Sequence, residues 1–274
     1  MFNYSEANLE SLNDDLDKTL EECKELVENI KLSTNVNLSD FNELESTVYD
    51  VSGRIAFLGD VHPHEKIRDF GNEADSKIQN FALEIFNDDD LYKKYKEIDI
   101  SNADKESIEF HKDLGTDFKN AGHGLSNESR NRLIEIDKKL IELGISYSEN
   151  IAKDKTELKF SEAELNGLSK NELNNLKKDK EKFIITMAYP NVNAVSENCN
   201  VRSTREKVWK AFNNRAVKDN IPILKEAVLL RNEKSKLFGF ETWAEYRLQN
   251  RMAKNPKNVD SMYRDLIPKL QKSA

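Results

Sequence analysis

The sequence predicts a mainly α-helical protein with a small β insertion. Apolar residues recur every three or four positions through most of the 274 residues, the spacing that places them on one face of a helix. Nine glycines and five prolines are few for an all-β or loop-rich fold. Charged residues make up 34% of the chain and apolar ones 38%, a balance typical of amphipathic helices.

The first half of the chain is predicted to form long antiparallel helices. The apolar residues between Leu9 and Ile30 lie on one stripe, and a second helix opens at Asp40 and carries apolar positions as far as Leu58. His62-Pro63-His64 then breaks the pattern. Further helices are expected over Glu65–Phe86, Leu91–Ile98, Ser107–Lys119 and from Ser126 to Tyr147.

Residues 156–190 have a different character. Thr156–Phe160 and Lys182–Tyr189 are short and rich in β-branched and aromatic residues, and Pro190 is expected to stop the second of them. Between them, Ser169 and Glu172 have the spacing of a capping box at the start of a short helix. We therefore expect a small sheet inserted in a helical protein.

The stretch from Val201 to Pro256 carries the clearest helix boundaries. One helix is expected to start at Asn220-Ile221-Pro222, with proline in the first turn, and to end at Gly239 in a left-handed cap. Thr242 to Glu245 fits a capping box, and Asn255-Pro256 opens a last helix that Pro268 should kink or end. Connectors this short predict that three helices of the stretch pack into a local core.

Charge and composition exclude several classes of partner. Thirteen acidic and three basic residues lie among the first 50, a net charge of −10 against −8 for the whole chain. The remainder has no basic excess of the size that nucleic acids or anionic membranes require. No apolar run reaches the roughly 20 residues of a membrane span, and the start lacks the pattern of a signal peptide. Cys23 and Cys199 are expected to be reduced thiols in a cytosol-like compartment.

The histidines offer little support for a metal site. His62 and His64 could chelate an ion, but no cysteine lies near them in sequence, and a place at a helix boundary is the alternative. His64-Glu65-Lys66-Ile67-Arg68 differs by one residue from HExxH, the motif whose two histidines bind zinc. Its fifth position is Arg68, which cannot coordinate zinc. His111 and His123 are interpreted as ordinary helix and loop residues.

No other catalytic constellation is complete. Cys199 could be a nucleophile, yet no nearby histidine supports it, and a buried thiol is the alternative. The glycines around His123 form too short a run for a phosphate loop, and G-x-S-x-G is absent. Pairs of acidic residues are numerous, but no other catalytic residue type lies beside them, so no pair can be assigned as general acid and base. From the residues alone we assign no catalytic residue and no metal ligand, and the substrate-binding residues stay undetermined.

Several separated motifs nevertheless follow one another in a recognisable order. In the second half they are Arg202–Val208, Ala211–Asn213, Ile223–Glu226, Leu230-Arg231, Lys234–Leu237, Gly239-Phe240, Ala244–Tyr246 and Met252–Lys254. Upstream they are Phe57-Leu58, Val61, Pro63, Ile67-Arg68, Glu73–Asp75, the helix Asn131–Tyr147 and Lys182–Pro190, in which Tyr-Pro is taken to close a strand. Together they resemble the thimet oligopeptidase and neurolysin family of zinc metallopeptidases over roughly residues 40–270.

The resemblance implies a mostly helical, intracellular endopeptidase that cleaves short peptides. Such enzymes have two helical lobes beside a narrow channel, with zinc held by the two histidines of HExxH and a downstream Glu while the Glu of the motif activates a water. No position of this sequence matches those residues, so no zinc is expected to bind this chain. The helices present would form one wall of the channel. A monomer is implied for the complete enzyme, in the cytoplasm or, for some members, in mitochondria.

Three regions follow from this interpretation. Residues 1–155 are a helical region, residues 156–200 a small α/β insertion, and residues 201–274 the helical start of a catalytic region. Two functions remain open: the N-terminal part of a metalloendopeptidase, inactive in the form given, or a non-catalytic helical protein that binds peptides or acts as a scaffold. An open reading frame that continues past Ala274 into HExxH would favour the first, and a genuine stop codon the second.

The last helices are also expected to lack a partner for their apolar faces. Leu237, Trp243, Tyr263 and Leu266 would be presented to a missing partner, and exposed apolar patches favour association. Marginal solubility of the chain is therefore expected.

Overall fold

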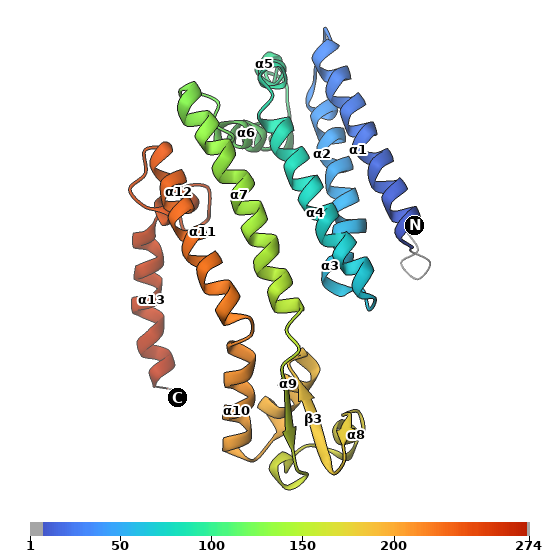
Figure 1. Ribbon diagram of the computed structural model, residues 1–274. Coiled ribbons are helices and arrows are strands. Elements are labelled where there is room, and N and C mark those ends of the chain that lie inside the picture. Colours follow the sequence, from blue (N-terminus) through green and yellow to red (C-terminus); the bar gives the residue numbers. More distant parts are fainter. Residues whose placement is uncertain (1–7, 273–274) are drawn as a thin grey trace. The chain divides into compact units, whose positions relative to one another are not determined.

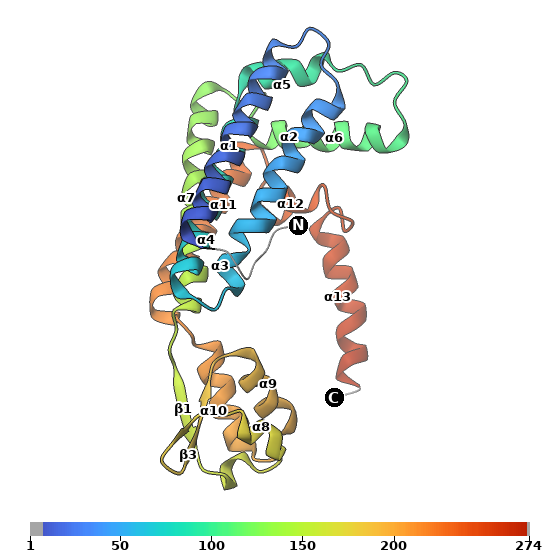
Figure 2. The same ribbon diagram turned by 90° about the vertical axis from the view of Figure 1, so that its right-hand side faces the viewer.

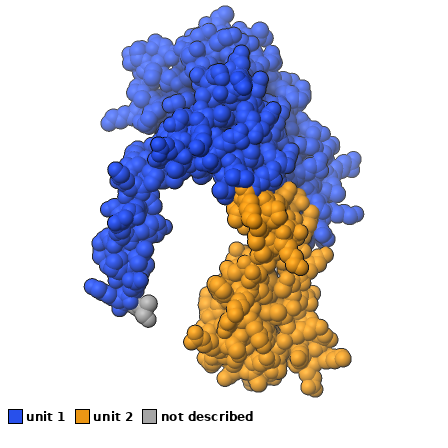
Figure 3. All heavy atoms as spheres, turned by 60° about the vertical axis from the view of Figure 1, so that its left-hand side comes forward, with its two compact units in different colours: residues 1–145, 226–274 blue, residues 146–225 orange. Residues whose placement is uncertain are grey.

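The computed structural model describes residues 8–272 and confirms a mainly α-helical fold with one small sheet (Figure 1). The chain divides into two compact units, coloured separately in Figure 3. Unit 1 contains residues 1–145 and 226–274, and unit 2 contains residues 146–225. The division into residues 1–155, 156–200 and 201–274 expected from the sequence remains a prediction. The two compact units divide the chain by its internal contacts, which does not test those boundaries.

Unit 1 consists of helices joined by short connections. In chain order these are α1 (Leu9–Leu32), α2 (Leu38–Val51), the π-helical turn η1 (Ser52–Ala56), α3 (Leu58–Val61), α4 (Glu65–Phe86), α5 (Asp89–Glu97), α6 (Lys105–Asn120), most of α7 (Asn127–Ala152), the end of α11 (Val217–Leu237), α12 (Trp243–Leu248) and α13 (Pro256–Gln271). The expected hairpin of α1 and α2 is present, and the two helices lie side by side in Figures 1 and 2.

Side-chain caps start the helices close to where the sequence indicates. Asn8 and Asn37 each form a capping box, with Ser11 and Asp40 respectively, so Asp40 lies in the first turn of α2 and does not precede it. Asp88 caps α5 by accepting hydrogen bonds from the backbone of Asp90 and Leu91. These local bonds fix the helix starts before any tertiary contact is considered.

The core of unit 1 has two buried clusters. One lies where α1, α2, α4, α5 and α6 meet, and its centre is Phe118, which has no solvent exposure. Phe41, Phe86, Tyr92 and Tyr95 place their ring centroids 5.3–6.2 Å from that of Phe118. The other cluster joins α1 to η1, α3 and α4 through Leu12, Leu16, Val51, Ile55, Leu58, Ile67, Ala74 and Ile78.

The helix expected as far as Leu58 is interrupted by η1. One π-helical turn spans Ser52–Ala56 between α2 and α3, and Ile55 inside it is fully buried. A π turn holds one more residue than an α turn, so it rotates the following side chains around the axis. Val51 before the turn and Leu58 after it are both buried in the same cluster.

Helices α3 and α4 approach each other through two glycines. A Cβ atom added at Gly71 would lie 2.3 Å from the backbone nitrogen of Gly59 and 2.8 Å from its Cα. A Cβ added at Gly59 would lie 2.5 Å from Oδ1 of Asn72. The absence of side chains at these two positions lets the backbones come this close.

Within unit 1, ion pairs tie the end of α11 to α7. Lys234 Nζ lies 2.5 Å from Oδ1 of Asp137, and both side chains are largely shielded from solvent. The guanidinium of Arg132 donates to both carboxylate oxygens of Glu233, at 2.6 and 3.0 Å. For the largely buried Lys234–Asp137 pair, the cost of desolvation offsets much of the attraction, and loss of either partner would leave a buried charge unpaired.

Unit 2 is built around an antiparallel sheet in the order β1-β3-β2. Its elements are β1 (Glu157–Phe160), η2 (Ala163–Leu165), α8 (Lys170–Asn174), β2 (Lys178–Asp179), β3 (Lys182–Thr186), α9 (Tyr189–Asn198) and α10 (Arg202–Asn213), with the end of α7 and the start of α11. Phe160 pairs with Phe183 in the register of β1 and β3. One face of the sheet is covered by buried residues of α9 and by Val208 of α10.

Two predictions about proline were wrong, and of the kink or end expected at Pro268 the end does not occur. Pro190 does not end a strand: β3 stops at Thr186, and Pro190 lies in the first turn of α9. Pro222 lies inside α11 rather than in its first turn, and α13 continues through Pro268 to Gln271. Residues Lys218 and Arg264, whose carbonyls these two prolines leave without a helical donor, are exposed, so water can solvate them.

The prediction that the helices of Val201–Pro256 pack into one local core was also wrong, because α10 and α12 belong to different cores. Val208 and Phe212 of α10 join the sheet core of unit 2. Tyr246 of α12, by contrast, stacks on Phe238 and packs against Phe240 just after α11, with centroids 5.1 and 5.7 Å away. Three helix boundaries predicted in this stretch are confirmed. Gly239 has a left-handed φ of +79°, Thr242 and Glu245 form the capping box of α12, and Asn255 caps α13.

Helix α13 presents an apolar face that no described residue buries. Tyr263 and Leu266 are 50% and 39% exposed, as expected, whereas Leu237 and Trp243 are half-buried. Figures 1 and 2 show α13 beside α12 at its first turn and apart from the other helices of unit 1. The predicted marginal solubility remains a prediction. None of the described helices is long and apolar enough to cross a membrane.

Candidate functional site

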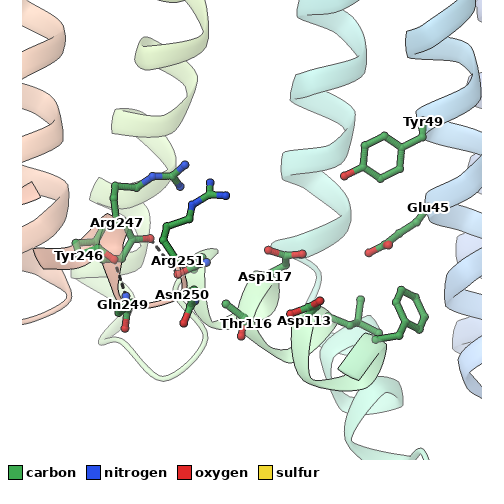
Figure 4. A pocket seen from close by; sticks show the side chains of 13 residues that line it. Glu45, Tyr49, Asp113, Thr116, Asp117, Tyr246, Arg247, Gln249, Asn250 and Arg251 are labelled. Carbon is green, nitrogen blue, oxygen red and sulfur yellow. Dashed lines mark hydrogen bonds between the residues drawn. The ribbon is translucent and has the colours of Figure 1, made fainter. Parts of the chain in front are cut away.

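A polar cavity of unit 1 lies between α2, α6 and the α12 region. Its volume is about 400 Å³. Figure 4 shows the side chains that line it: Glu45 and Tyr49 from α2, Asp113, Thr116 and Asp117 from α6, and Tyr246 and Arg247 from α12, followed by Gln249, Asn250 and Arg251. The cavity thus brings together segments that are 200 residues apart in sequence.

One side of the cavity is acidic. Asp113 and Asp117 are four residues apart on α6, which places them on the same face of that helix. Glu45 points toward them from α2 (Figure 4). None of the three carboxylates has a hydrogen-bond or ion-pair partner among residues 8–272, and the group does not form a metal site. Three unpaired carboxylates that share one cavity raise one another's free energy of ionisation.

The pKa values reflect this environment. Burial raises the pKa of Glu45 to about 7, and the negative charges of Asp117 and Asp113 add to the effect. The pKa of Asp117 is raised by desolvation and then by Asp113, although its side chain is still exposed in part. Near neutral pH, Glu45 therefore exchanges its proton readily, and the cavity gains a negative charge as the pH rises.

The other side of the cavity is held in place by Tyr246. Its hydroxyl donates a hydrogen bond to Oδ1 of Asn120 at 3.0 Å, which joins α12 to the end of α6. Burial raises its pKa to about 12, so the hydroxyl stays protonated. Arg247 and Arg251 follow on this side, and their charged groups have no carboxylate partner among the described residues. The cavity is therefore negative on one side and positive on the other.

A second, apolar pocket of about 220 Å³ adjoins the polar cavity. Glu45, Tyr49 and Asp117 line both spaces, so they lie at the boundary. The remaining lining residues are mostly apolar and come from α2, η1 and α4: Leu44, Val48, Ser52, Ile78, Gln79, Ala82, Ile85 and Phe86. Small-molecule sites commonly combine an apolar pocket with a few polar groups in this way.

Replacing Glu45 with glutamine is expected to stabilise the protein at pH 8 but not at pH 4.5. The folded-state pKa of Glu45 is raised, so its stabilising contribution is present when it is protonated and is lost as the pH rises through about 7. With solvent screening, the gain at pH 8 is on the order of 1 kcal/mol. The ionisable groups lining the cavity around it are Tyr49, Asp113, Asp117, Tyr246, Arg247 and Arg251.

Urea unfolding at both pH values measures this difference. Glu43→Gln is the matched control, because it makes the same change on an exposed face of α2 outside the cavity. An equal gain for both variants would show that Glu45 feels only the general acidic charge of the chain.

His62 and His64 lie at the break between α3 and α4, as the boundary interpretation predicted. The backbone N–H of His64 donates to Nδ1 of His62 at 3.1 Å. Arg68 stands where HExxH has its second histidine. Its guanidinium donates hydrogen bonds to the carbonyl oxygens of His62 and Pro63 at 2.7 and 2.9 Å. The near-motif therefore stabilises a helix start, and Arg68 has a structural role there.

The other two histidines are structural. His111 stacks on Tyr95, and burial lowers its pKa. His123 is buried, with Nε2 2.9 Å from the carbonyl oxygen of Phe86 and its ring stacked 4.1 Å from that of Tyr92. Desolvation lowers its pKa, with a smaller effect of Arg130 in the same direction. His123 thus joins the ends of α4, α5 and α6.

Both cysteines are buried and unbonded to each other. The thiol of Cys199 donates to the carbonyl oxygen of Glu164 at 3.4 Å, which fits a structural thiol. Burial raises the pKa of Cys23 to about 11, so this thiol is not a ready nucleophile.

The described residues do not fit a zinc site. Zinc in a catalytic site takes three protein ligands, and no three His, Cys, Asp or Glu side chains within residues 8–272 are placed to share a metal ion. His62 and His64 are near each other but have no third ligand beside them. No catalytic step through zinc can therefore be built on these residues.

Comparison with known proteins adds a second kind of observation. Residues 195–274 match the model of Peptidase family M3. The thimet-like oligopeptidase of Dictyostelium discoideum is 31% identical over 265 residues, covering 92% of this chain and 39% of that protein. A probable thimet oligopeptidase of Arabidopsis thaliana is 30% identical (88% of this chain, 34% of that protein), and oligopeptidase A of Escherichia coli is 27% identical (91% and 40%). The chain spans about two fifths or less of the length of these relatives.

Proposed function

We propose a function from the premise that this chain is related, over most of its length, to the thimet-type oligopeptidases of peptidase family M3. The chain corresponds to the N-terminal part of a zinc-dependent metalloendopeptidase that hydrolyses short peptides. The alignment with thimet-type relatives over 92% of the chain is the observation that carries the proposal. Long helices α1, α2, α4 and α7 would supply one wall of a peptide channel.

The chain of 274 residues is proposed to be inactive by itself. Hydrolysis in this family requires zinc, and the described side chains offer no ligand set for it. What the chain contributes is the shape and charge of the surface that meets the peptide. The two buried free thiols support a reducing compartment such as the cytoplasm.

A hydrolysis assay of the purified chain tests this proposal. With an internally quenched bradykinin-like peptide and added zinc, we expect no turnover above the protein-free control and no stoichiometric zinc after dialysis. A complete M3 oligopeptidase, assayed in parallel, shows that substrate and buffer are competent. Turnover by the chain that a chelator abolishes would overturn the proposed inactivity.

A non-catalytic peptide-binding protein is the second candidate. The observation that favours it is the cavity of unit 1, which is large enough for part of a peptide and carries unpaired charges of both signs. Both candidates expect no hydrolysis by this chain, so the reading frame past Ala274 separates them: continuation into HExxH supports the first candidate, and a genuine stop codon supports the second.

A further inference from the structure

We propose that helix α13, with the connection before it, docks on the surface of an anionic lipid bilayer. The helix would lie flat among the lipid headgroups, with its apolar face toward the acyl chains and its basic residues near the phosphates. The bilayer would be bound and not crossed, because the apolar face extends only from Val259 to Leu270.

The apolar face of α13 is continuous along the helix. Its residues recur at intervals of three and four positions, which gathers their side chains on one side. Val259 is half-buried, and the others are exposed: Met262, Tyr263, Leu266, Ile267 and Leu270. Met252, in the connection before the helix, is 97% exposed. Removing these side chains from water would be favourable, so the face is suited to an apolar environment.

The same segment is basic in a chain that is acidic overall. Residues 251–272 contain six basic and two acidic residues, a net charge of +4, against −8 for the whole chain. Both acidic residues are paired one turn along α13, Asp260 with Arg264 at 2.8 Å and Asp265 with Lys269 at 2.6 Å. The other basic residues of the segment are Arg251, Lys254, Lys257 and Lys272. Charge counted over the whole chain disfavours an anionic membrane, but charge counted over this segment favours one.

The acidic helices of unit 1 do not lie beside α13. Helices α1 and α2 carry most of the acidic charge of residues 1–50, and Figures 1 and 2 both show them apart from α13. Salt screens the repulsion between exposed charges and a lipid surface beyond about 10 Å. The local charge of the segment therefore decides whether it is attracted to the surface.

Charge also favours a lipid surface over a second copy of this chain. Two copies that paired through α13 would bring together two segments of net charge +4, which repel each other. Anionic headgroups have the opposite sign, and each lysine or arginine near them adds to the attraction. The segment is thus complementary to anionic lipid in both its apolar face and its charge.

Co-sedimentation of the purified chain with vesicles tests the proposal. One set of vesicles is phosphatidylcholine alone, and the other contains about 30% phosphatidylserine. We expect the chain to bind the phosphatidylserine vesicles at least ~10-fold more tightly at about 0.1 M NaCl. Binding to them should weaken at about 0.5 M NaCl, because the charges are then screened.

Two aspartate substitutions separate contact of the apolar face from charge attraction alone. Leu266→Asp places a carboxylate on the apolar face and should weaken binding to phosphatidylserine vesicles at least ~30-fold. Ser261→Asp adds the same charge on the polar face and should weaken it no more than about 5-fold. No residue of α13 is buried, so both variants should keep the urea-unfolding midpoint of the unchanged chain.

A lysine substitution tests the basic charge. Lys257→Gln should weaken binding to phosphatidylserine vesicles about 5-fold, because one basic charge near the surface is lost. Lys18→Gln is the matched control, since it removes the same charge from an exposed position on α1 and should change binding less than ~2-fold.

The proposal is overturned if the chain binds both kinds of vesicle equally, or binds neither by about 5 mM lipid. Equal weakening by Leu266→Asp and Ser261→Asp also overturns it, because the apolar face would then not contact the lipid. Sedimentation without lipid examines the second copy: a dimer that Leu266→Asp converts to a monomer, with no binding to vesicles, would mean that another chain covers the face and would refute lipid docking.

Discussion

Phe118→Ala should lower the free energy of unfolding of unit 1 by about 3–5 kcal/mol, the range for removing a fully buried phenylalanine. Phe118 has no solvent exposure and touches rings from α2, α4 and α5, including Phe41 and Phe86. Its removal leaves a cavity surrounded by several helices, and such a cavity cannot close by the movement of one side chain. The loss also removes the edge-to-face ring contacts.

The measurement can be confined to unit 1. Trp209 belongs to unit 2 and Trp243 to unit 1, so a Trp209→Phe background leaves Trp243 as the only tryptophan and as a reporter of unit 1 in urea unfolding. Phe57→Ala is the matched control, because Phe57 is 50% exposed and its removal should cost less than about 1 kcal/mol. A similar loss in both variants would mean that burial of Phe118 is not what stabilises this cluster.

Gly71→Ala should destabilise unit 1 by about 1–3 kcal/mol, although alanine is the better helix former. The new Cβ would meet the nitrogen and Cα of Gly59, and backbone atoms cannot rotate away as a side chain can. Helices α3 and α4 would have to separate, which disturbs the buried residues Leu58 and Ile67 beside them.

Gly144→Ala is the matched comparison. Gly144 is exposed within α7, and a Cβ there would meet nothing within 4 Å. Only helix propensity acts at this position, so the protein should gain up to about 1 kcal/mol. The two substitutions are chemically identical and should have opposite signs in the same unfolding assay. Stabilisation by both would show that α3 and α4 are not in the close contact described.

The helices that the sequence predicted well are those whose signals are local. Helix α4 runs over Glu65–Phe86 as predicted, because the His-Pro-His break and the apolar stripe are both read along one segment. The capping box of Ser169 and the left-handed Gly239 are likewise local, and both are present. In each case the side chain that decides the boundary lies within four residues of it.

The start of α11 was misplaced because a tertiary contact decides it. Asn220 is buried, donates to the carbonyl oxygen of Tyr147 at 3.0 Å and accepts from Asn150 at 2.9 Å, both near the end of α7. Ala216 donates its N–H to Asp154. These bonds order a helical turn before Pro222, which propensity alone would not place there.

The candidate site could be predicted only in part. Asp113 and Asp117 have a spacing that brings two like charges together on a helix, and such a pair is unfavourable unless something compensates it. That pattern can be read from the sequence. Glu45 and Arg251 cannot be added in this way, because their position beside α6 depends on how three distant segments pack. The resemblance to the thimet oligopeptidase family was recognised from the order of its motifs. Comparison with M3 relatives confirmed that resemblance.

The π turn η1 has a consequence for how the length of this chain can vary among its relatives. A π turn equals an α turn with one residue inserted, so removal of one residue from Ser52–Ala56 would restore an uninterrupted α-helix there. The exposed Gly53, beside which a Cβ would meet nothing, is the position where such a deletion disturbs its neighbours least. Even there, a deletion would leave Val51 and Leu58 six positions apart, on different faces of a regular α-helix, so relatives aligned with this chain should keep the full length of this turn.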